Sequence, residues 1–242
     1  MKCSSVFLLL VFSATVFAQA TPDQSQPLSP EERGDVYMAR KMYREAAEMY
    51  SRNAGKSALM WDKAGIAYQQ LSDLNAARRA YERAIRLDKK YADPVNNVGT
   101  IFYSEKKYRS AINRYRRAIE LSPDSAAFWS NLGTAWYSRG KYDLMNDAYA
   151  KALQLDPQIF EKNSAVGTRM MDRGVTDRAR YHFEMARLFA GYGKNELALQ
   201  YLRKALEEGF KEKDKVQQAK EFSGLRETQE FKDLMALEPR VL

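Results

Sequence analysis

The sequence predicts an all-α solenoid, in which helical hairpins stack one on the next. Three observations support this fold class: residue types recur every 34 residues, apolar residues lie at helical spacing in two stretches per copy, and a short polar turn separates the stretches. An ordinary helix bundle would not keep a fixed period. The repeat therefore favours stacked units that bury their faces on their neighbours.

The period is clearest over residues 58–159, where three tandem copies place a glycine and a tyrosine at matching positions. The glycines are Gly65, Gly99 and Gly133, and the tyrosines are Tyr81, Tyr115 and Tyr149. Because glycine inside a helix costs about 1 kcal/mol relative to alanine, we expect a close approach of the paired helix at each glycine. Ala77 and Ala111 are expected to supply the small facing surfaces, with the tyrosines as wedges between layers.

Proline is expected to end the second helix of two copies. Pro123 and Pro157 follow the second apolar stretch in their copies, and proline cannot continue the helical hydrogen bonds. The preceding copy has Lys89 at this place. The repeated glycine, tyrosine and alanine, together with the proline that ends two of the copies, resemble the tetratricopeptide repeat. The resemblance implies a right-handed α-solenoid of antiparallel helix pairs, whose first helices line a concave groove for a peptide or a partner's helix.

The array is predicted to cover residues 31–208 and to end in a helical cap. Its copies are expected at about 28–57 (shortened), 58–91, 92–125, 126–159 and 160–208 (irregular). Two phases fit the irregular copy, so helices are expected near 160–172, 176–190 and 195–208 with their pairing left open. Residues 209–242 resemble the helical tail that closes bacterial chains of this family.

Residues 1–20 have the features of a secretory signal peptide. Lys2 precedes an apolar run, and Ala18-Gln19-Ala20 is a small-x-small cleavage pattern, so cleavage is expected after Ala20. A retained membrane anchor is the alternative. Residues 21–30 read as a flexible leader. We expect an exported protein, periplasmic or secreted, with no transmembrane segment after cleavage and no cysteine, because Cys3 lies in the signal.

Positive charge is concentrated between Leu74 and Arg117, where twelve Lys or Arg stand against four Asp or Glu. The predicted basic face consists of Arg78, Arg79, Arg83, Arg86, Arg114, Arg116 and Arg117. A solvated helix surface explains such a run. The alternative is an electrostatic binder of an acidic protein or an anionic envelope surface. Nucleic acid is not an expected partner, since export removes the chain from it and the aromatics lie at core phase.

The resemblance also implies which residues face the groove. Asn97 and Asn131 each lie two residues before a repeat glycine, and a carboxamide offers a donor and an acceptor to a peptide backbone. The predicted groove residues are Lys63, Gln69, Asn97, Thr100, Tyr103, Asn131, Thr134 and Tyr137. They fit an ordinary helix surface equally well. The cationic clamp that some family members use for a C-terminal carboxylate is missing here.

The sequence contains no pattern that predicts catalysis, a metal site or a cofactor. Nucleophile and phosphate-loop motifs are absent, and the single histidine, His182, cannot form a typical zinc site without cysteines. We therefore predict a non-catalytic adaptor or scaffold that binds a protein or peptide partner.

Overall fold

The structure, a computed structural model, describes residues 27–160 and 175–237, and every regular element in these ranges is a helix. The predicted all-α solenoid of antiparallel helix pairs is confirmed. Four hairpins form the first part: α1 (Pro30–Ala39) with α2 (Tyr43–Asn53), α3 (Ala58–Gln70) with α4 (Leu74–Leu87), α5 (Ala92–Ser104) with α6 (Tyr108–Leu121), and α7 (Ala126–Tyr137) with α8 (Tyr142–Leu155).

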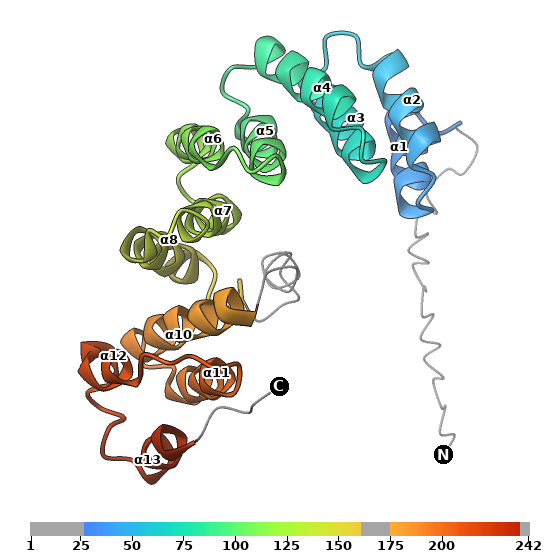
Figure 1. Cartoon of the computed structure of the whole chain (residues 1–242). Coiled ribbons are helices and arrows are strands. Elements are labelled where there is room, and N and C mark those ends of the chain that lie inside the picture. The colour runs from blue at the N-terminus through green and yellow to red at the C-terminus, as the bar shows by residue number, and fades with distance from the viewer. Residues whose placement is uncertain (1–26, 161–174, 238–242) are drawn as a thin grey trace, which may run out of the picture.

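The hairpins are arranged along an arc (Figure 1). Helices α3, α5 and α7 lie towards its inner side, and α4, α6 and α8 lie towards its outer side. Each second helix also packs against the first helix of the next hairpin. The first helices therefore form one continuous inner surface.

Residues with a left-handed backbone reverse the chain inside each hairpin. They are Lys41, Ser72, Lys106 and Gly140, with φ between 59° and 68°, and only the last is a glycine. The residue after each one donates its backbone N–H to a carbonyl in the last turn of the first helix, as Lys107 does to Phe102 at 2.8 Å. This bond closes the helix end as a Schellman motif does.

The second helices of the period end where the sequence predicts. Helices α6 and α8 stop two residues before Pro123 and Pro157, as expected. Helix α4 stops at the matching residue, Leu87, although Lys89 stands in place of the proline. Packing of the repeat is therefore sufficient to set this boundary.

A glycine and a tyrosine make the central contact of each hairpin. A Cβ on Gly99 would lie 2.7 Å from Cε1 of Tyr115, and the pairs Gly34–Tyr50, Gly65–Tyr81 and Gly133–Tyr149 are at least as close. These tyrosines are fully buried. The prediction that small residues meet the glycines is therefore wrong, because the ring of the tyrosine on the second helix occupies that space.

Ala77 shows what the small residues of the second helices do instead. It is fully buried in a cluster with Val98 and Ile101, which belong to the next hairpin. A small side chain at this place lets α5 approach α4, so alanine governs the contact between hairpins and glycine governs the contact within them.

The C-terminal part begins with another helix pair. Helices α10 (Val175–Gly191) and α11 (Asn195–Glu207) match the two later helices expected in the irregular copy, and they pack against each other along their length. This settles the pairing that the sequence left open for these two. The helix expected near 160–172 falls almost entirely outside the described residues.

Short helices follow α11 and share its core. They are α12 (Lys213–Gln218), the 3₁₀ helix η1 (Lys220–Phe222) and α13 (Gln229–Ala236). Phe210, Phe222 and Phe231 are buried with residues of α10 and α11, and the rings of Phe183 and Phe210 stack at 4.4 Å. Lys213 Nζ donates to the carbonyl oxygens of Met235 and Leu237 at the end of α13.

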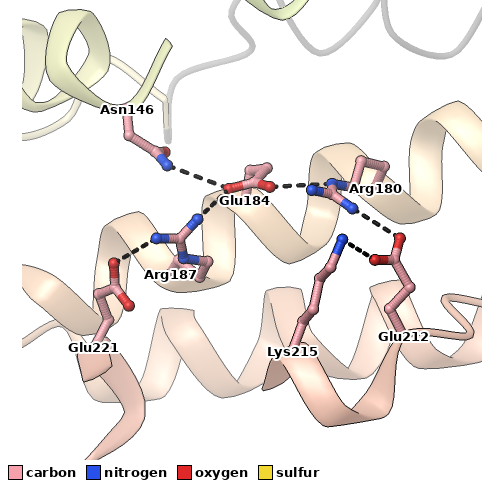
Figure 2. A network of polar contacts seen from close by, with 7 residues as sticks. All are labelled: Asn146, Arg180, Glu184, Arg187, Glu212, Lys215 and Glu221. Atoms are coloured by element: carbon pink, nitrogen blue, oxygen red, sulfur yellow. Dashed lines mark hydrogen bonds and ion pairs between the residues drawn. The ribbon is translucent and has the colours of Figure 1, made fainter. Parts of the chain in front are cut away.

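A network of charged and polar side chains joins α10 to α8 and to the segments that follow α11 (Figure 2). Glu184 of α10 lies at its centre and is fully buried. It accepts hydrogen bonds from Arg180 at 3.0 Å and Arg187 at 2.9 Å, both also on α10, and from Asn146 of α8 at 3.2 Å. Arg180 also binds Glu212 at 2.9 Å, and Arg187 binds Glu221 at 2.8 Å. Each charge in the core of this network is therefore paired.

Within residues 27–160 and 175–237, no helix is long and apolar enough to cross a membrane.

Replacing Gly99 with alanine should lower the free energy of unfolding by about 1–3 kcal/mol, because the new methyl group forces the Tyr115 ring out of a packed position. Chemical denaturation measures the change. Gly224→Ala is the matched control, since a Cβ there meets nothing within 4 Å. If the main cause is the ring, most of the penalty should disappear in a Tyr115→Ala background, where only the contact with Arg114 Cβ at 3.2 Å remains. An equal loss in that background would contradict this explanation.

Candidate binding surface on the first helices

Hydrogen bonds between side chains join successive first helices along the inner side of the arc. We call these bonds the polar ladder. Lys63 Nζ donates to Glu31 at 2.7 Å, Asn97 Nδ2 donates to Asp62 at 3.1 Å, and Asn131 Nδ2 donates to Asn96 at 2.9 Å. In every case the donor lies two residues before a repeat glycine, and the acceptor lies three residues before the glycine of the preceding hairpin. The ladder therefore follows the repeat.

Lys63 forms the first step of the ladder with two carboxylates. Besides Glu31 it binds Asp35, at 2.9 Å to each oxygen. Partial burial lowers the pKa of Lys63, but the hydrogen bonds to Glu31 and Asp35 outweigh it and hold the pKa above its ordinary value. The lysine is thus charged and held by α1.

Asp62 is the buried acceptor of the second step, with 3% of its surface exposed. It accepts hydrogen bonds from Asn97 and, at 3.0 Å, from the hydroxyl of Tyr91. Burial raises its pKa to about 6, and these two hydrogen bonds offset burial only in part. No cation binds this carboxylate among the described residues. Neutral donors compensate a buried charge less than a guanidinium does.

The tyrosines that cross the glycines reach the same inner side with their hydroxyl groups. Tyr50 donates to Asp35 at 2.6 Å, Tyr81 to Gln69 at 2.9 Å and Tyr115 to Thr100 at 3.4 Å, and the Tyr149 hydroxyl pairs with Thr134 at 3.0 Å. The partner follows the glycine directly in three hairpins. In the second hairpin that residue is Ile66, so Gln69 one turn later takes its place.

Five of the predicted groove residues are partly exposed, and all five are engaged in these bonds. They are Lys63, Gln69, Asn97, Thr100 and Asn131. Asn131 uses only its Nδ2, so its Oδ1 accepts no hydrogen bond from the described residues. This carboxamide can therefore accept a hydrogen bond from an additional partner, and the Gln69 Nε2 can donate one.

Three other predicted groove residues are buried instead: Tyr103, Thr134 and Tyr137. The Tyr103 hydroxyl lies 2.9 Å from Ser138 Oγ in the next hairpin. Thr134 Oγ1 lies 3.0 Å from the hydroxyl of Tyr149, which covers it. The ring of Tyr137 meets the ring of Tyr181 edge-on, with 5.6 Å between the ring centres. Tyr103 and Tyr137 are taken up by contacts with the next hairpin, and Thr134 by a contact inside its own hairpin. The sequence pattern does not reveal these contacts.

The sequence interpretation did not assign Asp62 and Asn96 to this surface as acceptors. A signal for them exists, because a polar residue recurs three positions before each repeat glycine. The four residues are Glu31, Asp62, Asn96 and Ser130.

Comparison with known protein families agrees with this geometry. The tetratricopeptide repeat family matches residues 58–91, and a second family described as TPR repeat matches residues 99–140. Residues 58–91 and 99–140 of this chain are therefore tetratricopeptide repeats. No curated protein matches the sequence.

Solved structures of MamA share the fold of this tetratricopeptide-repeat array. A crystal structure of MamA is 21% identical and covers 78% of this chain and 93% of its own, with a TM-score of 0.52. MamA from Desulfovibrio magneticus RS-1 is 17% identical, covers 76% and 94%, and has a TM-score of 0.51. YrrB, described as a TPR protein with an unusual peptide-binding site, is 18% identical, covers 76% and 86%, and has a TM-score of 0.49.

The predicted basic face of the tetratricopeptide array is divided among several environments. Arg83 lies over the ring of Trp61 at 4.7 Å, and Arg116 lies over Trp136 at 5.3 Å. Arg117 is paired with Glu120 at 2.9 Å. The remaining members are Arg78, Arg79, Arg86 and Arg114, for which the structure gives no ion pair with a described residue. The seven arginines therefore do not form one uniform surface.

His182 lies in the interface of α10 and α11. Its ring is 5.8 Å from the rings of Tyr181 and Tyr201, and its Nδ1 is 2.9 Å from Glu208 Oε2. Burial lowers the pKa of His182, and the Glu208 carboxylate opposes this shift. In the described part of the chain, no three His, Cys, Asp or Glu residues form a group that could hold a metal ion.

Asp62 should give the array a distinct pH dependence. Because its pKa is about 6 when folded and about 4 when unfolded, the native state binds more protons between these values, and the free energy of unfolding should fall as pH rises through this window. The free energy difference between wild type and Asp62→Asn should change by up to about 3 kcal/mol from pH 4 to pH 7.

Denaturation at a series of pH values measures this difference. Asp124→Asn, at an exposed residue of the α6–α7 loop, is the control and should run parallel to wild type. A parallel curve for Asp62→Asn would show that Asp62 does not titrate in this range.

Proposed function

We propose that this protein is a non-catalytic adaptor that binds a peptide or a helix of a partner protein along the inner side of its tetratricopeptide array. Such arrays generally serve as scaffolds for protein interactions, with the concave side as the usual binding surface. The observation that carries the proposal is the polar ladder, which lines the inner side with half-buried carboxamides in register with the repeat.

The chemistry of the ladder suits the backbone of a bound segment. A peptide unit presents one donor and one acceptor, and a carboxamide matches both without reading the side chain. Asn131 Oδ1 is the acceptor with spare capacity, while Asn97 is held on one side by Asp62 and on the other by Asn96 at 3.3 Å. A partner would bind by adding to Asn131 and by competing for Asn97.

The site of action belongs to the same proposal. The signal-like segment 1–20, which lies outside the described residues, supports export to the periplasm or the envelope. The adaptor would meet its partner there.

The double substitution Asn97→Ala/Asn131→Ala should weaken partner binding about tenfold, because two hydrogen-bonding groups are lost from the proposed surface. In-cell crosslinking and purification of the tagged chain identify the partner, and titration with the purified partner gives the affinity. Asn75→Ala/Asn113→Ala, at two exposed residues of α4 and α6, is the matched control.

Removing Asn97 also removes a hydrogen bond from Asp62, so Asn131→Ala alone should be tested and unfolding of each variant measured. Unchanged affinity in both folded variants would refute binding at this surface.

Export predicts a mature protein that begins at Thr21. The double substitution Ala18→Arg/Ala20→Arg should block cleavage, because both positions of the cleavage pattern need small side chains. Gln19→Ala should leave cleavage intact. Mass spectrometry of the periplasmic fraction measures the N-terminus. An unprocessed wild-type chain that stays with the membrane would favour the retained anchor instead.

A further inference from the structure

The hairpin of α3 and α4 carries a cavity with a volume of about 330 Å³. Trp61 and Tyr68 of α3 contribute aromatic rings to its lining, and Arg79, Arg83 and Arg86 of α4 contribute guanidinium groups. We call this cavity the arginine groove. Glu82 is its only acidic lining residue, so three positive charges stand against one negative charge.

The three arginines lie on one stripe of α4 because they are four and then three residues apart. All three are exposed, and none forms an ion pair or hydrogen bond with a described residue. Arg83 is held over the Trp61 ring at 4.7 Å. Stacking on an indole fixes the plane of a guanidinium while leaving its N–H groups free to donate.

Arginines in the C-terminal part of the chain differ in this respect. Arg180 and Arg187 each bind two carboxylates of the chain itself (Figure 2). The groups in the arginine groove have the same chemistry without the internal partners. Their pairing capacity is available to another molecule.

We infer that the arginine groove binds carboxylate side chains in an acidic segment of a partner protein. Guanidinium groups bind carboxylates through paired hydrogen bonds, and the two rings provide apolar contact for the intervening side chains of the segment. The arginine groove contains none of the residues of the polar ladder, so the inference does not rest on the proposed adaptor function.

The next hairpin shows why an acidic protein segment fits better than an extended anionic membrane surface. The equivalent cavity there is lined by Phe102, Arg114 and Arg117. The position equivalent to Arg79, 34 residues later, is occupied by Asn113. The position equivalent to Arg86 is occupied by Glu120, which pairs with Arg117. The stripe of three arginines beside two aromatic rings is therefore not repeated in this next hairpin, and a short acidic segment matches such a single site better than an extended membrane surface does.

The test uses the full chain and a short fluorescent peptide in which glutamate alternates with leucine. Arg79→Gln/Arg83→Gln/Arg86→Gln should weaken binding about tenfold, and added salt should weaken wild-type binding to a similar degree. The matched control is Arg44→Gln/Arg109→Gln/Arg203→Gln, which removes the same charge from three exposed arginines without described ion pairs and should change affinity less than about twofold.

Arg83→Lys adds a test of geometry. It keeps the charge and removes the planar group over Trp61, so it should weaken peptide binding as well. The inference is overturned by equal losses in the two triple variants, or by equal binding of a peptide with glutamine in place of glutamate. It is also overturned if vesicles containing phosphatidylglycerol, and not the peptide, bind wild type and lose binding in the groove variant.

Discussion

The contact between a glycine of each first helix and a tyrosine of each second helix is the constraint on which the rest of the array depends. The ring crosses the helix where no Cβ stands, so the two helices approach closely and the phenol passes through to the inner side. There its hydroxyl group pairs with a residue such as Thr100 or Thr134. One contact therefore fixes the packing of a hairpin and the polarity of the surface that the hairpins share.

Buried carboxylates show how the array handles charge in two ways. Glu184 is fully buried. Arg180 and Arg187 supply it with positive charge and hydrogen bonds, and Asn146 adds a neutral hydrogen-bond donor. Asp62 receives only the neutral donors of Tyr91 and Asn97, and burial raises its pKa to about 6. The first arrangement locks the C-terminal helices in place. The second leaves a buried carboxylate that is protonated more readily than an exposed one.

The two sides of the first hairpins also differ in how completely their polar groups are paired. On the inner side the polar groups of the ladder bond to a neighbouring hairpin, the tyrosine hydroxyls bond within their own, and Asn131 keeps one spare acceptor. On α4 the guanidinium groups of Arg79, Arg83 and Arg86 have no carboxylate among the described residues. A partner on the inner side must therefore compete with internal bonds, whereas an acidic partner on α4 meets groups that are already free.

The sequence alone accounts for the hairpin repeat, its turns and the ends of its helices, because a period of 34 residues records local backbone preferences and the alternation of large and small side chains. It also placed Asn97 and Asn131 on the inner side. It could not say that tyrosine fills the space at each glycine, that Tyr137 is buried, or that α10 pairs with α11. Those outcomes depend on contacts between residues far apart in the chain, and such contacts leave no mark on local spacing. Tertiary structure alone decided which polar side chains were taken up by neighbouring hairpins and which stayed available.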